Sequence, residues 1–204
     1  GLNARPKRRF KRTTDSHHAF PIAPNLIDQN FSAERPNQKW AADISYLWTA
    51  EGWLYLAVIL DLFSRRVVGW AVSDRLHKEL ALQALGKALA IRRPKEGLIH
   101  HSDRGSQYCS LAYQAELRKH AIQISMSGKG NCYDNAVVET FFKTLKTELV
   151  WRTVFQSRAE AKDAIGRYID GFYNPVRRHS TLDFVSPVQF EKLTRQLLNR
   201  SPLN

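Results

Sequence analysis

The sequence has 204 residues, a mass of 23.5 kDa, 43% hydrophobic side chains and a formal net charge of +12. This length favours one domain with appendages, and the hydrophobic content is sufficient for a full core, which excludes a wholly disordered chain. No apolar run approaches the roughly 18 residues of a membrane-spanning helix, and the basic N-terminus has no apolar stretch behind it. We therefore expect neither a membrane segment nor a secretory signal.

The two cysteines, Cys109 and Cys132, lie 23 positions apart and form no C-x-x-C pair. This excludes a disulfide framework and a zinc ribbon, and it suits a reducing cytosol. Because residue 1 is glycine rather than methionine, we expect a fragment of a longer chain.

The positive charge is concentrated at the two ends of the sequence. Residues 13–139 have a net charge of +1 and residues 140–204 a net charge of +5. Six basic side chains and no acid stand in the first twelve residues: Arg5, Lys7, Arg8, Arg9, Lys11 and Arg12. A polyanion, most simply DNA, is the indicated partner, with a merely solvated arm as the alternative.

Hydrophobic periodicity predicts an irregular basic arm or linker over 1–35, followed by three strands. These are 40–48, which alternates, 53–63, which is apolar throughout and so buried on both faces, and 66–72. Short turns between them indicate an antiparallel meander.

The period then changes, and helices and strands alternate. Helical spacing of apolar residues, strand-like runs and a glycine-rich loop follow in chain order: helix 78–92, strand 97–102, helix 110–120, strand 121–127, loop 128–134, and helices 135–150, 157–173 and 186–199. This order predicts an α/β fold of ribonuclease H-like type, with a mixed five-stranded sheet flanked by helices and extra C-terminal helices. The expected core spans 36–195, with a tail over 196–204.

Three carboxylates are candidates for one catalytic site. Asp43 lies in an apolar strand, where an acid is costly unless it is paired or holds a metal, Asp103 follows the fourth strand, and Glu139 begins a strong helix. If the first and fourth strands are neighbours, the three can hold two hard cations about 3.5–4 Å apart for phosphodiester chemistry.

Each acid also has a structural interpretation. Asp43 can be a satisfied strand acid, Asp103 a turn residue beside Gly105, and Glu139 the intrahelical partner of Lys143. Asp61, at the end of the buried second strand, competes with all three, and spacing alone does not decide among them.

The helix that begins near residue 135 has a polar stripe beside its buried one. Glu139, Lys143 and Lys146 stand at i, i+4 and i+7, which suits a metal ligand followed by a track for DNA phosphates. An ion pair with Glu139 needs only Lys143.

Together with these acids and lysines, four segments give the sequence a family resemblance. The segments are QKWAADISY (38–46), HHSDRGSQY (100–108), GKGNCYDNAVVETFFKTLKTELV (128–150) and YNPVRRHSTLDFVSPVQFE (173–191). They resemble the DDE transposases of the insertion sequence three family, whose catalytic region is integrase-like. The 35 residues between Asp103 and Glu139 are the spacing typical of this family and of retroviral integrases.

The resemblance implies a metal-dependent transposase. It assigns Asp43, Asp103 and Glu139 as catalytic metal ligands for Mg²⁺, with Mn²⁺ as a substitute and two ions during catalysis. It leaves supporting roles to His101 and Asp61. The reaction is cleavage at the insertion-sequence end followed by transfer of the 3′-hydroxyl.

The same resemblance implies DNA partners and an assembly. The expected partners are terminal inverted repeats and target DNA, bound by a homo-oligomer in the bacterial cytoplasm at the nucleoid. A helix-turn-helix region expected upstream is missing from this sequence, and residues 5–12 resemble the end of its linker. Two alternatives remain: a ribonuclease H-like nuclease that only hydrolyses, and an inactive DNA-binding or assembly module.

Overall fold

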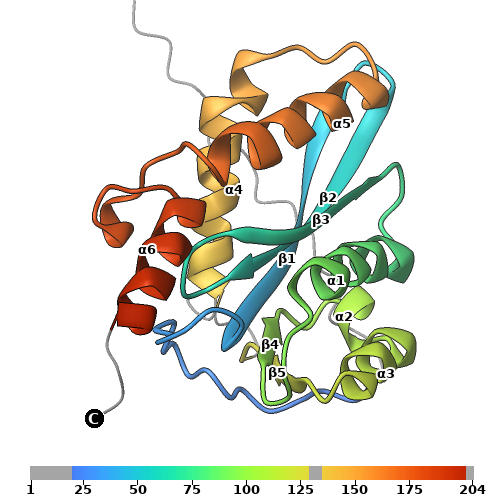
Figure 1. The fold of residues 1–204 in the computed structure, drawn as a ribbon. Coiled ribbons are helices and arrows are strands. Elements are labelled where there is room, and N and C mark those ends of the chain that lie inside the picture. The colour runs from blue at the N-terminus through green and yellow to red at the C-terminus, as the bar shows by residue number, and fades with distance from the viewer. Residues whose placement is uncertain (1–19, 129–134, 201–204) are drawn as a thin grey trace, which may run out of the picture.

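The computed structural model describes residues 20–128 and 135–200 and contains one mixed five-stranded sheet (Figure 1). The strand order is β3-β2-β1-β4-β5. In chain order the strands are β1 (Lys39–Thr49), β2 (Gly52–Asp61), β3 (Val67–Ser73), β4 (Ile99–Ser102) and β5 (Gln123–Met126). The first three pair antiparallel, whereas β4 and β5 add in parallel. The predicted α/β fold is confirmed.

The second strand ends earlier than its apolar run does. The sequence predicts a strand to residue 63, but β2 stops at Asp61, whose Oδ1 accepts the Phe63 N–H at 3.0 Å. Arg65 has a left-handed backbone (φ 60°), and its N–H donates to the Asp61 carbonyl at 2.8 Å. A hydrogen-bonded turn therefore replaces the last two predicted strand positions.

Helices cover both faces of the sheet (Figure 1). On one face lie α1 (Lys78–Arg92), α2 (Ser106–Cys109) and α3 (Leu111–Lys119), and on the other lie α4 (Ala136–Glu148) and α5 (Arg158–Gly166). Successive β2 residues point to opposite faces, so Val58 packs in the α4 cluster and Ile59 in the α1 cluster. The continuous apolar run of β2 is thus explained by burial on both sides.

The C-terminal helical region differs from its expected single helix over 157–173. After α5 the chain continues as a π-helix, η3 (Arg167–Tyr173), in which the Asn174 N–H donates to the Ile169 carbonyl at 3.0 Å. The wider turn carries Asn174 to β3, where its side chain accepts the Val67 N–H at 2.9 Å and donates to the Val67 carbonyl at 3.0 Å. This side-chain mimicry of a strand partner caps the sheet, and periodicity alone does not reveal it.

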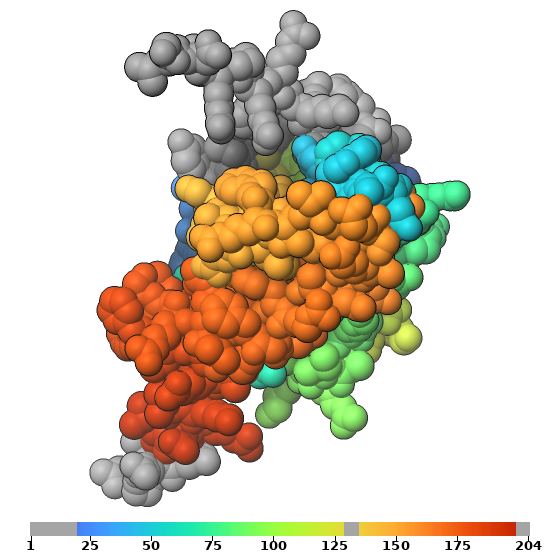
Figure 2. Space-filling model, turned by 90° about the horizontal axis from the view of Figure 1, so that it is seen from above, coloured from blue at the N-terminus to red at the C-terminus, as the bar shows by residue number. Residues whose placement is uncertain are grey.

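Two short helices and one long helix complete the described chain. The short ones are η2 (Val150–Arg152) and η4 (Ser180–Leu182), and the long one is α6 (Pro187–Arg200). Since α6 reaches Arg200, it continues past the core boundary expected at 195. Viewed from above, α5 and the segment linking it to α6 form one continuous surface beside the β1–β2 turn (Figure 2).

Part of the segment expected as an arm packs on the body. The Pro24 carbonyl accepts the Met126 N–H at 3.2 Å, the Leu26 N–H donates to Ser125 Oγ at 2.9 Å, and Ile27 is buried. These contacts cover β5, one of the two edge strands of the sheet. The six basic residues at 5–12 lie outside the described residues. Among the residues described, no helix has the length and apolarity needed to cross a membrane.

Candidate active site

Two of the three predicted acids stand at adjacent positions of neighbouring parallel strands. The last registered pair of β1 and β4 is Ala42 with Ser102, and Asp43 and Asp103 are the next residue on each chain. Asp43 is two residues beyond Ala41, which packs in the same cluster as α4, so the Asp43 side chain lies on the α4 face of the sheet. The condition set by the sequence, that the first and fourth strands be neighbours, is met.

The third acid approaches from the helix that crosses these strands. Asn135, which precedes α4, donates from Nδ2 to the Ala42 carbonyl at 3.2 Å, while Val138 is fully buried against the sheet. This contact anchors the start of α4 beside β1, and Glu139 lies in its first turn with an exposed side chain. Asn135 thus joins α4 to the sheet instead of capping the helix with its side chain.

The cluster is electrostatically unbalanced. Burial raises the pKa of Asp43 well above its usual range, and the negative charges of Asp103 and Glu139 raise it further. The Ile44 N–H, which donates to Asp43 Oδ1 at 2.7 Å, and the charge of Lys146 act in the opposite direction. Burial also raises the pKa of Glu139. A cation placed among these carboxylates would relieve this repulsion.

The backbone orients the paired acids. Asp103 Oδ1 accepts the Gly105 N–H at 2.9 Å. Asp103 is therefore a turn residue, as one interpretation expected, and it also follows β4 next to Asp43. Within residues 20–128 and 135–200, no three His, Cys, Asp or Glu side chains are grouped closely enough to hold a metal ion. The exposed Glu139 therefore lies within electrostatic range of Asp43 without completing a three-ligand cage. Oxygen donors and excess negative charge nevertheless fit a hard divalent cation.

The two lysines of α4 have different surroundings. Lys143 is exposed, whereas Lys146 is half-buried with Nζ 5.4 Å from the centroid of the Tyr46 ring. Burial lowers the pKa of Lys146 and the charge of Asp43 opposes that shift. Glu139 forms no ion pair within the part of the chain described here. Among the described residues, Lys146 is accordingly a cation whose charge acts on the acid cluster, and Lys143 is exposed to solvent.

His101 lies behind the acid pair. It is buried, with Nδ1 2.8 Å from Ser125 Oγ and Nε2 3.3 Å from Ser127 Oγ. These contacts join β4 to β5 and the residue that follows it, so His101 supports the strand that ends at Asp103.

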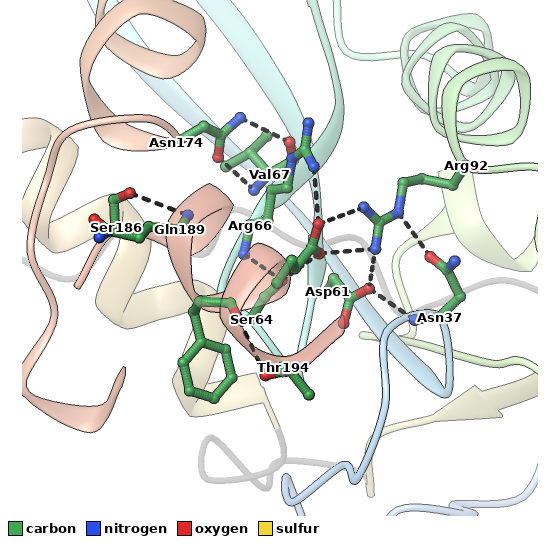
Figure 3. A network of polar contacts seen from close by, with 12 residues as sticks. Asn37, Asp61, Ser64, Arg66, Val67, Arg92, Asn174, Ser186, Gln189 and Thr194 are labelled. Carbon is green, nitrogen blue, oxygen red and sulfur yellow. Dashed lines mark hydrogen bonds and ion pairs between the residues drawn. The ribbon is translucent and has the colours of Figure 1, made fainter. Parts of the chain in front are cut away.

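Asp61 belongs to a different cluster (Figure 3). It lies opposite Trp40 on β1, three positions before Asp43, and is completely buried. Its Oδ2 accepts the Asn37 N–H at 2.8 Å and Arg92 Nη2 at 2.9 Å. Arg92 in turn pairs with Glu191 of α6 at 2.8 Å. Asp61 therefore ties β2 to α1 and α6, and it is not brought to the acid cluster.

Tyr108 is a further candidate that the sequence patterns do not single out. Its hydroxyl is buried without a hydrogen-bond partner among the described residues, and burial together with the charges of Asp43 and Asp103 raises its pKa well above the usual value. Tyr108 is the last residue of the HHSDRGSQY segment, which is the signal available for it. The charges of both acids therefore act on this buried hydroxyl.

The fold and this site define the class of integrase-type cores with a ribonuclease H-like sheet. Two family models described as integrase core domain match residues 33–132 and 120–187. The chain is 48% identical to a 31 kDa protein of insertion element IS600 from Shigella sonnei, over 96% of this chain and 72% of that protein. It is 49% identical to the transposase InsF of insertion sequence IS3A from Escherichia coli K12, over 94% of this chain and 66% of InsF. The chain belongs to the integrase-like transposases of the insertion sequence three family.

Solved structures agree with this fold. The chain resembles a simian T-cell lymphotropic virus intasome solved with PP2A regulatory subunit B56 gamma, with a TM-score of 0.64, 20% identity, and coverage of 94% of this chain and 62% of that one. It also resembles the HTLV-2 integrase catalytic core domain solved in complex with magnesium, with a TM-score of 0.59, 17% identity, and coverage of 78% and 99%.

Proposed function

We propose that this chain cuts and joins DNA strands at insertion-sequence ends with Asp43, Asp103 and Glu139 as its catalytic metal ligands. The observation that carries the proposal is the juxtaposition of Asp43 and Asp103 on β1 and β4, with the charge of Glu139 close enough to act on Asp43. A carboxylate cluster whose repulsion raises a pKa is typical of a site that binds cations. We assign the catalytic unit to residues 36–195.

The three acids would hold Mg²⁺, with Mn²⁺ as a substitute and two ions during the reaction. When bound, the ions supply activation of the attacking oxygen and stabilisation of the leaving one. The HTLV-2 core of the same fold was solved with magnesium. The chain's own residues orient the site: the Ile44 N–H fixes the Asp43 carboxylate, the Gly105 N–H fixes that of Asp103, and Tyr108 provides a buried hydroxyl donor.

DNA is the proposed substrate and partner, as terminal inverted repeats and target. The relatives that are named transposases support this assignment, as does the net charge of +12. Lys143, Lys146 and the basic residues at 5–12 are proposed to contact phosphates, and assembly as a homo-oligomer on DNA follows the intasome neighbour. The place of action is the bacterial cytoplasm, at the nucleoid.

A strand-transfer assay tests the proposal. A pre-cut end of the chain's own insertion sequence and a target plasmid are incubated with Mg²⁺, and joined products are measured. Glu139→Gln should abolish joining, while Glu79→Gln, the same change in the first turn of α1, should leave it unchanged. Cleavage without joining would favour the hydrolytic nuclease. DNA binding with neither reaction would favour the inactive module.

A further inference from the structure

A second polar site lies on the other flank of α4. A cleft of about 430 Å³ opens between α4, the β2–β3 turn and the link between α5 and α6. We call it the arginine cleft; its polar lining includes Arg65, Arg177, Arg178, His179, Thr140 and Thr144. Thr140 and Thr144 stand about 120° around the helix from Glu139. The cleft is therefore separate from the acid cluster and shares with it only the helix that divides them.

The lining of the arginine cleft is cationic. It contains three arginines and no Asp or Glu. Arg177 is neutralised, since its Nη2 and Nε lie 2.7 Å and 2.9 Å from Glu148 Oε1. Arg65 and Arg178 form no ion pair within the described residues. Arg178 and Arg65 thus have no carboxylate within ion-pair distance among the described residues, although the charge of Asp61 acts on Arg65 from further away.

Two buried donors in the cleft have no acceptor. Within the residues described, Arg65 Nη1 and His179 Nε2 are both buried and unpartnered. Leaving such groups unsatisfied costs free energy, and one tautomer of histidine donates from Nε2. Burial lowers the pKa of Arg65, and burial with the neighbouring Arg177 charge lowers that of His179 to about 4. Both side chains would gain hydrogen bonds from an anionic acceptor.

The lining is held in place before any ligand arrives. His179 packs edge-on against Tyr173, with ring centroids 5.0 Å apart, and its N–H donates to the Val185 carbonyl at 3.2 Å. Arg65 keeps its left-handed backbone through the hydrogen bond to Asp61. A site with fixed cationic and unsatisfied donors favours a tetrahedral oxyanion, because its oxygens accept several hydrogen bonds at once.

The position of the cleft favours a phosphate within DNA over a free anion. The cleft is open to solvent at Arg178 and Thr140, which are exposed. Lys143 is also exposed, and around the axis of α4 its direction falls between those of Glu139 and Thr140. A helix with its side chains is about 10 Å across. Each strand advances about 3.4 Å per nucleotide along the duplex axis, so about three nucleotides span this width where a duplex axis runs across α4.

We propose that the arginine cleft binds a backbone phosphate of DNA, about three nucleotides from the phosphodiester at the acid cluster, through Arg65, Arg178 and His179. This inference rests on the proposed function for its ligand. It makes α4 a ridge with the reacting phosphate on one flank and an anchoring phosphate on the other.

The test measures DNA affinity without divalent metal, so that it is independent of cleavage. A duplex of arbitrary sequence is titrated in EDTA at several salt concentrations with the wild type, Arg65→Gln and Arg178→Ala. Each variant should lower the slope of log K against log salt by about one, equally for different sequences. Arg93→Gln is the matched control, because Arg93 is exposed and also has a left-handed backbone (φ 42°). Thermal unfolding verifies that each variant folds.

The outcomes separate the possibilities. Slopes equal to that of Arg93→Gln overturn the proposal, and the exposed Arg178 keeps the experiment decisive if Arg65→Gln does not fold. Inorganic phosphate should raise the melting temperature of the wild type more than that of Arg178→Ala. If phosphate does so while the DNA slopes are unchanged, the cleft binds a free anion and the DNA proposal is wrong. If the two variants show the slope changes but the wild type never joins strands, the proposed function is refuted and the cleft assignment stands.

Discussion

The protein has two acid clusters, one around Asp43 on β1 and one around Asp61, which pairs with Trp40 three positions before Asp43, and the surroundings of their carboxylates differ. At Asp43, burial and neighbouring carboxylates raise the pKa, and among the described residues Lys146 and the Ile44 N–H oppose them. At Glu191, hydrogen bonds from Arg92, Ser64 and Arg66 lower the pKa despite burial. Asp61, next to Arg92, is intermediate: its pKa is raised by burial while Asn37, Phe63 and Arg92 oppose the shift. Arginine partners therefore distinguish Glu191, whose pKa is lowered, from Asp43, whose pKa is raised.

The difference separates structural acids from reactive ones. The Asp61–Arg92–Glu191 network joins β2, α1 and α6 and has donors for its carboxylate oxygens (Figure 3). In the Asp43 cluster the carboxylates of Asp103 and Glu139 repel the charge of Asp43, and a bound cation would relieve that repulsion. Substitutions in the two clusters should therefore have opposite effects on activity and stability.

The largest effect is expected from Asp43→Asn. Strand transfer should fall by more than about 100-fold, since disturbing even the partners of metal ligands costs 10–100-fold. Without metal, the melting temperature should hold or rise, because a repelled buried charge is removed while the Ile44 N–H keeps an acceptor.

Asp61→Asn is the matched control for that variant. Its activity should persist, but its stability should fall by about 1–3 kcal/mol, because an amide cannot accept from Asn37, Phe63 and Arg92 together. Equal stability changes in the two variants would contradict the contrast.

Glu191→Gln should destabilise the fold by about 3 kcal/mol. It removes the charge that accepts from Arg66 and twice from Arg92, at 2.8–2.9 Å, and leaves partly buried arginines unpaired. Urea unfolding should show a lower midpoint at an unchanged slope. Glu96 is exposed, so the free energy of unfolding of Glu96→Gln should stay within about 0.5 kcal/mol of the wild type. If Glu96→Gln were destabilised as much as Glu191→Gln, the stabilising role of the network would be refuted.

Acid should weaken the Glu191 network and the separate ion pair of Glu148 with Arg177. The pKa values of Glu191 and Glu148 are lowered in the folded protein by their arginine partners, so their stabilisation is complete above the unfolded glutamate pKa. It is lost as the pH falls from about 4.5 through the folded values. The free energy of unfolding should therefore drop more steeply over this range in the wild type than in Glu191→Gln. Parallel curves would show that Glu191 contributes no such dependence.

The smallest effect concerns the α4 lysines. Lys146→Ala should slow strand transfer by about 10-fold with the fold intact, because it removes the cation facing Asp43 and a cation–π contact of about 0.5–1 kcal/mol with Tyr46. Lys143→Ala should mainly lower the salt slope of DNA binding, by about 0.9. Lys146→Cys should also crosslink to thiol-modified DNA near the cleavage position. Normal transfer by Lys146→Ala together with no crosslink would refute the assignment of this residue.

Local pattern predicts most of the fold. The spacing of apolar residues predicts the strands, the helix over 78–92 and the helix that carries Glu139. The structure places α1 at Lys78–Arg92 as expected. The π-helical turn at Arg167–Tyr173 is not predicted, since it depends on Asn174 reaching Val67 on a distant strand. The short helix α2 also escapes prediction, being too brief to show a period.

The candidate site is predictable as a set of residues and not as a geometry. The sequence alone determined the order and period of the elements and offered Asp43, Asp61, Asp103 and Glu139 as acids, because periodicity and residue type are local properties. Only the tertiary structure decided that β1 pairs with β4 and that Arg92 forms an ion pair with Asp61. It alone also turned Lys146 toward Asp43 and left Arg65 and His179 facing a cleft. Those outcomes depend on which partners meet across long stretches of chain, and the compensation of a buried charge is fixed by the partners that meet it.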